Sequence, residues 1–313
     1  MDDVLLEIEN LSVYFPGRAG KKYYAVRELD LTLQENKTLA IVGESGSGKS
    51  MTALAVMGML PAYAKQEGAV RFGVQDLSIL SQKKRRKYYG NEIAMIYEQP
   101  MSCLNPTMTV GRQIAEAYRN HFSCGHTRAK LEALSLMEEV GLAESKYKKY
   151  PHELSGGMQQ RVMIAIAISG RPRLLIADEP TTSLDVTIQM QIIQLLKGLI
   201  DRYNMAMLLI THDMGLVAEL ADDVLVLYGG RVMEQAEVFS FFDAPSHPYA
   251  QALVDVIRSD AIEAIEGSAP NLFEPVAGCP FSPRCAKAID VCNEQCPPLA
   301  RESGRVRRCH IHA

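Results

Sequence analysis

The chain has 313 residues, of which 47% are hydrophobic and 22% are charged, and its formal net charge is −4. This composition is typical of a globular protein with one large domain and a smaller one, and the slight acidity argues against a nucleic-acid binder. No apolar run approaches the ~20 residues of a membrane span, and the acidic start "MDDVLLEIEN" lacks the regions of a signal peptide, so we expect a cytoplasmic protein.

The N-terminal part predicts strands followed by a glycine-rich turn. Residues 4–15 and 24–33 alternate apolar and polar side chains, which predicts antiparallel strands with a hairpin tip at "GRAGKK". The short apolar run "TLAIV" (38–42) predicts a buried strand, and a helical pattern follows over 49–60. The basic run "QKKRRKYYG" (82–90) is typical of a solvated loop.

Strands and helices continue to alternate up to about residue 258. Further strands are predicted at 92–97, 173–180, 205–213 and 222–234. Helical periodicity covers 110–149, "SGGMQQRVMIAIAIS" and "DVTIQMQIIQLLKGLIDRY". After Asp260 the periodicity weakens and Pro and Cys become frequent. We therefore predict a larger domain over 1–258, with a helical subdomain at about 100–170, and a Cys-rich C-terminal extension over 259–313.

The segment "GESGSGKS" (Gly43–Ser50) matches the pattern G-x-x-x-x-G-K-[ST] between a predicted strand and a predicted helix. In this phosphate loop the glycines let backbone N–H groups turn toward phosphate oxygens, and the helix N-terminus adds positive potential. Lys49 is expected to reach the β- and γ-phosphates of ATP, and the Ser50 hydroxyl to ligate Mg²⁺. The candidate nucleotide contacts here are Gly43, Ser45, Gly46, Gly48, Lys49, Ser50 and Met51.

Two acids end the predicted strand in "LLIADEP" (174–180). We predict that Asp178 binds Mg²⁺ through water and that Glu179 is the catalytic base that polarises the water attacking the γ-phosphate. An acid pair that caps a helix is the plain alternative, and the phosphate loop makes it much less favoured.

A second anion-binding turn is predicted in "ELSGGMQQR", where Ser155, Gly156 and Gly157 precede a helix. A chain with two phosphate-binding turns suggests two chains that share nucleotides. With this pair of motifs, residues 4–250 resemble the ATP-binding subunit of ABC transporters. The resemblance implies an α/β fold: a P-loop NTPase (RecA-like) core, an antiparallel β-subdomain and a helical subdomain. It also implies a head-to-tail dimer with ATP between the phosphate loop of one subunit and the LSGG turn (154–157) of the other.

The resemblance assigns further residues to the nucleotide site. It places "SLD" (183–185) at the D-loop, with Asp185 near the dimer interface, and His212 near the γ-phosphate as a catalytic group. It also implies an aromatic residue that stacks on adenine. Phe15 matches that position best and Tyr14 second, while a plain core aromatic stays an open alternative.

The resemblance also points to the stretch "IYEQPM" as the Q-loop, where the family commonly has Gln before Glu. Here Glu98 occupies the position of the glutamine and Gln99 follows it. Glu98 is expected to ligate Mg²⁺ directly, or else a one-residue shift places Gln99 in the usual role. Pro100 favours an extended residue 99 and resists such a shift.

The motifs "EQPMSCLNP", "ADEPTTSLDVTIQ", "SHPYAQAL" and "GCPFSPRC" resemble the peptide/nickel import branch of the family. The resemblance implies a peripheral ATPase at the cytoplasmic face of the membrane. Its partners would be a second, usually different, ATPase, two membrane permeases and an extracytoplasmic binding protein. The alternatives are a soluble ABC ATPase without a permease and a degenerate subunit that binds nucleotide without turnover.

Five of the seven cysteines crowd into the last 35 residues. In a reducing compartment such clustering favours a metal site over disulfides, and the wide spacing without C-x₂-C pairs suits an iron–sulfur cluster better than zinc. The peptide-importer resemblance implies a [4Fe–4S] cluster held by Cys279, Cys285, Cys292 and Cys309, with Cys296 extra. Zinc, or no metal, remains open.

Overall fold

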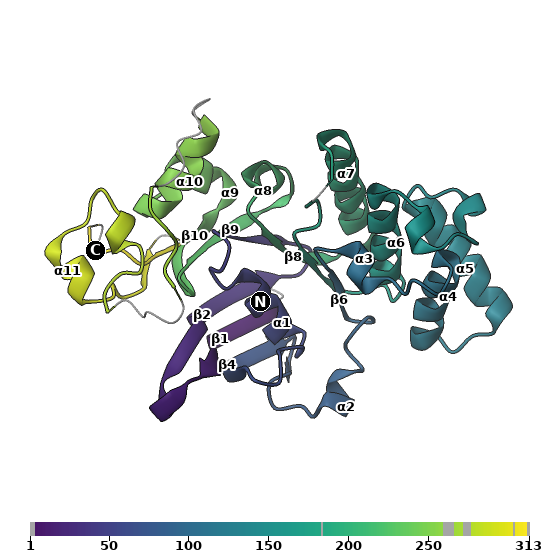
Figure 1. Ribbon diagram of the computed structural model, residues 1–313, viewed down its shortest axis with the longest axis horizontal. Helices are drawn as coiled ribbons and strands as arrows, with labels where there is room; N and C mark the ends of the chain where they lie inside the picture. Colours follow the sequence, from purple (N-terminus) through teal and green to yellow (C-terminus); the bar gives the residue numbers. More distant parts are fainter. Residues whose placement is uncertain (1–3, 183, 259–265, 272–276, 303, 312–313) are drawn as a thin grey trace. The chain divides into compact units, whose positions relative to one another are not determined.

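The structure is a computed structural model of the chain. It describes residues 4–182, 184–258, 266–271, 277–302 and 304–311 (Figure 1). The chain divides into two compact units. The first comprises Met1–Leu33, Thr38–Ile79 and Ile210–Ala313, and the second comprises Gln34–Lys37 and Leu80–Leu209. The domain boundary predicted at residue 259 falls inside the first unit and stays a prediction.

The first unit contains an antiparallel sheet in the order β2-β1-β4-β5. Its strands are β1 (Val4–Pro16), β2 (Lys22–Gln34), β4 (Lys65–Phe72) and β5 (Gln75–Asp76). β1 and β2 occupy the two segments predicted from alternation, and the 3₁₀ turn η1 (Arg18–Gly20) joins them at the expected hairpin tip. β4 was not predicted from the sequence; its Gly68 lies against the backbone of Asn10, at a bulge in β1.

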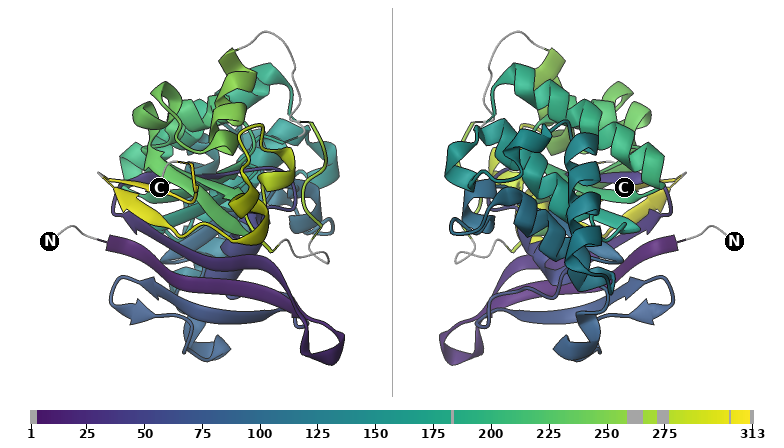
Figure 2. Two further views of the ribbon diagram at one scale, coloured as in Figure 1. Left: turned by 90° about the vertical axis from the view of Figure 1, so that its left-hand side faces the viewer. Right: turned by 90° about the vertical axis from the view of Figure 1, so that its right-hand side faces the viewer.

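A second sheet runs through the first unit in the order β3-β9-β10-β12-β11. Its strands are β3 (Thr38–Val42), β9 (Asp223–Tyr228), β10 (Arg231–Glu237), β11 (Ala300–Glu302) and β12 (Arg305–Arg307). β3 and β9 pair in parallel, whereas β12 pairs antiparallel with β10. The C-terminal segment (277–311), yellow in Figure 2, therefore adds strands to the edge of this sheet beside β10.

Helices flank these strands. In the first unit they are α1 (Lys49–Val56), α8 (Met214–Leu220), α9 (Val238–Asp243), α10 (Pro248–Arg258), η4 (Ser282–Arg284) and α11 (Asp290–Glu294). The helix predicted over 49–60 ends at Val56, so its last turn was overpredicted. Within the chain as described, no helix is long and apolar enough to cross a membrane.

In the second unit, strands β8 (Ala206–Thr211), β7 (Leu174–Asp178) and β6 (Ile93–Ile96) lie side by side in that order, and β6 and β7 are parallel. All residues of these strands are buried, which explains their continuous apolar sequences. The helices of this unit are α2 (Gln82–Arg85), α3 (Pro100–Cys103), α4 (Val110–His121), α5 (His126–Glu139), η2 (Glu144–Lys146), η3 (Pro151–Glu153), α6 (Gly156–Ile168) and α7 (Val186–Tyr203).

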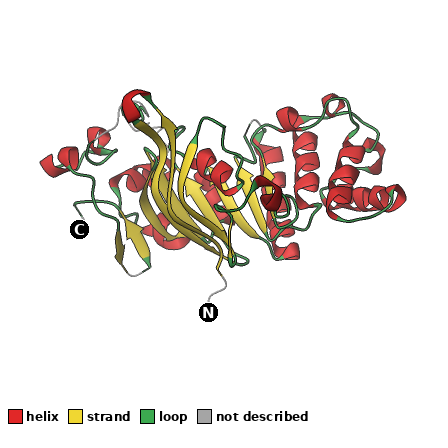
Figure 3. Cartoon of the chain, turned by 90° about the horizontal axis from the view of Figure 1, so that it is seen from below, coloured by secondary structure: helices red, strands yellow, loops and turns green. Residues whose placement is uncertain are grey.

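Helices α4, α5 and α6 pack on one another at the right of Figures 1 and 3. α6 is apolar on nearly all sides, and Val162 and Ile164 are fully buried in the core that it forms with its neighbours. The run 82–90 was predicted as a loop and begins instead with the short helix α2. Its Lys and Arg residues are good helix formers, and Lys83 and Lys84 are exposed as expected of a solvated segment.

Candidate functional site

The phosphate loop connects the buried strand β3 to helix α1, as the sequence predicted. Its glycines have positive φ: +150° at Gly43, +77° at Gly46 and +106° at Gly48. A Cβ atom at Gly43 would lie 2.1 Å from the Leu227 carbonyl oxygen, and one at Gly48 would lie 2.4 Å from that of Ala25. The loop thus needs glycine both for its backbone conformation and for its close approach to neighbouring backbone.

Lys49 is 8% exposed, and its ammonium group donates to the carbonyl oxygens of Gly43, at 2.6 Å, and Glu44, at 3.1 Å. The lysine side chain therefore folds back over its own loop and places its charged group at the carbonyl oxygens of that loop. Ser47 is buried and its Oγ has no hydrogen-bond partner among the described residues, so the loop holds a polar group that a ligand could satisfy. Ser45, Gly46 and Ser50 are exposed.

Asp178 and Glu179 follow the buried strand β7. Asp178 is 7% exposed, and Glu179 adopts a left-handed backbone conformation with φ of +48°. This conformation is uncommon for glutamate and such strain occurs frequently at functional positions. Its carboxylate accepts a long hydrogen bond of 3.4 Å from Thr182 Oγ1.

The LSGG turn opens helix α6. Ser155 is the N-cap in an extended conformation, and its side chain makes no capping hydrogen bond to the described backbone. Ser155 and Gly156 are exposed, while a Cβ atom at Gly157 would lie 2.6 Å from Ile188 Cγ2. Ser155 and the start of the helix are thus accessible to solvent, and the first N–H groups of a helix lack partners within it, as an anion-binding turn requires.

Glu98 and Gln99 lie between β6 and α3, and both are exposed. Gln99 is extended, with φ of −116° and ψ of 95°, as expected of a residue before proline. Its carbonyl accepts hydrogen bonds from the backbone and hydroxyl of Ser102. The local backbone is therefore held in place after Gln99, and the choice between Glu98 and Gln99 stays a prediction.

Two predicted site residues, Asp185 and His212, lie at the starts of helices. Asp185 is the N-cap of α7 and accepts a hydrogen bond from Ile188 N at 3.0 Å. His212 is exposed after β8, and the next residue, Asp213, caps α8. The predicted D-loop residue Ser183 lies outside the described residues.

Phe15 is the penultimate residue of strand β1 and is partly exposed, so it is not a plain core residue. Its ring centroid lies 5.7 Å from that of Tyr63, which is 69% exposed. Tyr14 is engaged elsewhere, since its hydroxyl donates to Glu67 and Lys22 lies over its ring. The geometry favours Phe15 over Tyr14 as an accessible stacking surface and adds Tyr63, which no sequence motif indicated.

The C-terminal cysteines Cys279, Cys285, Cys292 and Cys309 line a single pocket, which His247, Phe281 and His310 also line. Burial raises the pKa of Cys279 to about 11, against a hydrogen bond with the Phe281 backbone that lowers this pKa. Cys296 is not among the lining residues and faces Arg308 at 3.9 Å. No group of three or more His, Cys, Asp or Glu side chains in the described residues is arranged to hold a metal ion.

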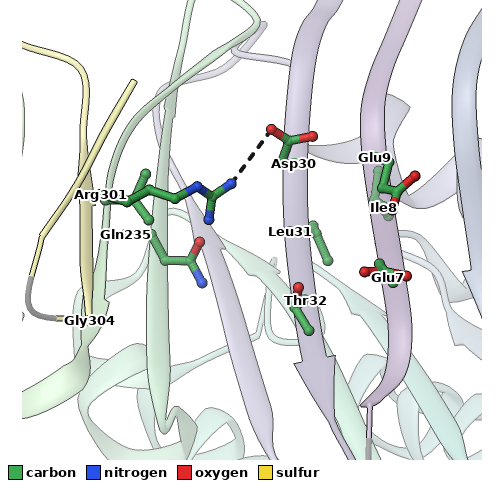
Figure 4. Close-up of a pocket in the computed structure, with 10 residues that line it drawn as sticks. Glu7, Ile8, Glu9, Asp30, Leu31, Thr32, Gln235, Arg301 and Gly304 are labelled. Atoms are coloured by element: carbon green, nitrogen blue, oxygen red, sulfur yellow. Dashed lines mark ion pairs between the residues drawn. The ribbon is translucent and has the colours of Figure 1, made fainter. Parts of the chain in front are cut away.

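A larger surface cavity of about 570 Å³ lies between β1, β2 and the strands of the C-terminal segment (Figure 4). Arg301 of β11 pairs with Asp30 of β2 across it at 3.6 Å. The carboxylates of Glu7 and Glu9 both pair with Arg71. Each of these three acids therefore pairs with an arginine of the same chain, and the Arg301–Asp30 pair connects the C-terminal segment to the N-terminal sheet.

The predicted site residues are divided between the two units. The first unit carries Phe15, the phosphate loop, His212 and the cysteines; the second carries Glu98, Gln99, the LSGG turn, Asp178, Glu179 and Asp185.

Comparison with known proteins decides the family. Residues 26–182 match the ABC transporter family, and residues 233–292 match the C-terminal region of oligopeptide/dipeptide transporters. The chain belongs to the ABC transporter ATP-binding subunits. It is 44% identical to the oligopeptide transport ATP-binding protein AppD of Bacillus subtilis, with 98% of this chain and 97% of AppD covered. It is also 44% identical to the dipeptide transport ATP-binding protein DppD of Escherichia coli, with 98% and 96% covered.

Solved ABC structures share the fold. The dimeric ATP-binding cassette MJ0796 bound to ADP and phosphate superimposes with a TM-score of 0.67 at 26% identity, covering 75% of this chain and 99% of that one. CbiO1 of Clostridium perfringens, part of the transporter complex CbiONQ, gives a TM-score of 0.66 at 25% identity, covering 77% and 92%. This ABC ATPase therefore has the α/β ABC ATPase fold predicted from its motifs, and like its family it hydrolyses ATP.

Proposed function

We propose that this ATPase powers the import of peptides through separate membrane permeases. The observation that carries the proposal is a phosphate loop shaped for a nucleotide in a chain that also matches the C-terminal region of oligopeptide/dipeptide transporters. Relatives named as oligopeptide and dipeptide transport proteins share 44% of their residues with it. Peptides are favoured over nickel or a metal chelate for the same reason.

The mechanism that the residues support is in-line attack of water on the γ-phosphate. Lys49 binds the β- and γ-phosphates and neutralises charge, while Glu179 orients the water and accepts its proton. His212 holds the γ-phosphate, and Phe15 stacks on adenine. Ser50, the buried Asp178, and Glu98 or Gln99 offer the oxygen donors that Mg²⁺ prefers. When bound, that ion neutralises charge on the phosphate oxygens.

The working assembly that we propose is a head-to-tail heterodimer of two ATPase subunits. In this arrangement Ser155, Gly156 and Gly157 of one subunit bind the ATP held by the phosphate loop of the other, and Asp185 lies near the interface. The solvent-facing LSGG turn supports this arrangement. Two membrane permeases and an extracytoplasmic binding protein complete the importer, which places this chain at the cytoplasmic face of the membrane.

The test is transport by the assembled system. We expect ATP hydrolysis that rises when the partner permeases are co-purified, and ATP-dependent uptake of labelled di- or oligopeptides into proteoliposomes. Hydrolysis without any dependence on a permease would instead favour an ABC ATPase that works without one. Nucleotide binding without hydrolysis would favour a degenerate subunit, and uptake of Ni²⁺ but not peptides would reassign the substrate.

We further propose that Cys279, Cys285, Cys292 and Cys309 hold a [4Fe–4S] cluster. Four thiols around one largely buried pocket, with Cys296 outside it, match the ligand set inferred from the resemblance. Anaerobic purification should give protein with iron, acid-labile sulfide and visible absorption, and Cys292→Ser should lose all three. Zinc without iron, or neither metal, would overturn the assignment.

A further inference from the structure

The phosphate loop contains an acidic residue, Glu44, next to its first glycine. A carboxylate in a loop that binds a triphosphate is electrostatically unfavourable, because like charges repel strongly where water is partly excluded. Yet every polar group of Glu44 is engaged. Its carbonyl accepts from Lys49 Nζ, its N–H donates to the Tyr249 hydroxyl at 2.9 Å, and its carboxylate binds an arginine.

That arginine is Arg284, from the C-terminal segment 240 residues away. Its Nη1 donates to Glu44 Oε2 at 2.7 Å and its Nη2 donates to Oε1 at 3.0 Å, which is the bidentate geometry that suits a guanidinium and a carboxylate. The side chain of Arg284 is 7% exposed and that of Glu44 is 28% exposed. The pair is thus largely removed from water and is no surface ion pair of small effect.

Other contacts orient the guanidinium toward the loop. Nη1 also donates to the Tyr228 hydroxyl at 2.9 Å, and Nε donates to the Glu266 carbonyl at 2.8 Å. The Tyr228 ring in turn packs against those of Tyr249 and Phe281. Tyr249 is the residue whose hydroxyl accepts the Glu44 N–H, so one aromatic cluster contacts both partners of the ion pair. The C-terminal segment therefore contacts the phosphate loop through a preorganised charged group.

We propose that Arg284 promotes ATP binding by neutralising the Glu44 carboxylate at the start of the phosphate loop. The C-terminal segment then contributes directly to nucleotide affinity in addition to any role of its cysteines. Because the inference concerns only ATP binding, it does not depend on the transported substrate or on the iron–sulfur proposal.

The experiment is a double-mutant cycle read out by the Kd of a fluorescent ATP analogue for the full chain, with KM and kcat of hydrolysis measured in parallel. Arg284→Gln leaves Glu44 charged and unpaired beside the triphosphate, so we expect Kd and KM to rise about tenfold, with a smaller change in kcat. Glu44→Gln removes the repulsion, so the double variant should regain most of the lost affinity. Glu44→Gln alone should bind ATP at least as tightly as the unaltered chain.

Arg305→Gln is the matched control. Arg305 also anchors the C-terminal segment, through the carbonyls of Ala244 and Ser240, but it makes no contact with the phosphate loop in the described structure. Its Kd for ATP should not change.

Absence of rescue in the double variant, or an equal loss of affinity in Arg305→Gln, would overturn the proposal and assign Arg284 a purely structural role. If Arg284→Gln fails to fold, the Glu44→Gln variant alone tests the proposal. Weaker ATP binding by that variant would contradict it, because removal of the negative charge should reduce repulsion of the triphosphate. Iron content measured on every variant separates this result from loss of the proposed cluster.

Discussion

The phosphate loop and the LSGG turn are both glycine-containing turns that open a helix, but the chain surrounds them very differently. Neighbouring residues hold much of the phosphate loop, although Ser45, Gly46 and Ser50 are exposed. Lys49 is buried, Gly43 and Gly48 lie against neighbouring backbone, and Arg284 pairs with Glu44. In the LSGG turn Ser155 and Gly156 are exposed. The difference is that residues of its own chain hold much of the first turn in place, whereas Ser155 and Gly156 of the second are open to solvent.

The largest effect expected from this comparison comes from exchanging glycines. In Gly48→Ala, the new Cβ would meet the Ala25 carbonyl at 2.4 Å at a φ of +106°, so we expect ATP binding to be lost and the free energy of unfolding to fall by ~2 kcal/mol or more. In Gly156→Ala, the nearest described atom outside the turn is Leu184 Cδ2 at 3.7 Å, so folding and ATP binding should survive. Thermal unfolding and nucleotide titration measure both.

Gly198→Ala in α7 is the control for these exchanges, since nothing lies within 4 Å of its new Cβ. The free energy of unfolding of this variant should not fall. Equal tolerance of alanine at Gly48 and Gly156 would contradict the difference between the two turns.

The next largest effect is expected at Glu179, where a substitution should slow ATP hydrolysis without weakening ATP binding. Glu179→Gln keeps the shape of the side chain but removes the base, so turnover should fall ~10²–10⁴-fold while ATP binding at the phosphate loop is retained. Glu116→Gln, an exposed exchange on α4, is the matched control and should hydrolyse ATP normally. Near-normal hydrolysis by Glu179→Gln would remove Glu179 from the role of base.

A smaller effect is expected at the open turn. Ser155→Ala removes a donor for a charged phosphate, which is worth about tenfold or more in turnover, and the isolated chain should still bind ATP as before. Ser135→Ala, at an exposed position of α5, serves as the control. If Ser155→Ala weakened ATP binding by the monomer as strongly as it slowed turnover, the turn would serve its own chain's nucleotide.

The smallest effect is expected at the Q-loop. Loss of a carboxylate in Glu98→Gln should raise the Mg²⁺ concentration needed for half-maximal turnover about threefold if Glu98 is the ligand. The double exchange of Glu98→Gln with Gln99→Glu tests the order of the two residues. An unchanged Mg²⁺ dependence in both variants would mean that the order carries no function.

Local sequence patterns were sufficient for most elements and for the phosphate loop. Continuous apolar runs identified β3, β7 and β8, and the G-x-x-x-x-G-K-S spacing identified the loop, because both depend on residues close together in the chain. Strand β4 was missed because its polar sequence, "KQEGAVRF", becomes a strand by pairing with β1. The short helix α2 was missed because its basic residues show no apolar periodicity.

The sequence by itself determined the family, the phosphate loop and the candidate catalytic residues, since these depend on short motifs of fixed spacing. The tertiary structure alone decided that β12 pairs with β10, that Tyr63 lies beside Phe15, and that Arg284 reaches Glu44 from 240 residues away. No local pattern encodes such partners. A buried charge needs a partner of opposite charge, and a strand edge needs a partner for its backbone hydrogen bonds. Which residues supply these partners is decided only when distant segments come together in the fold.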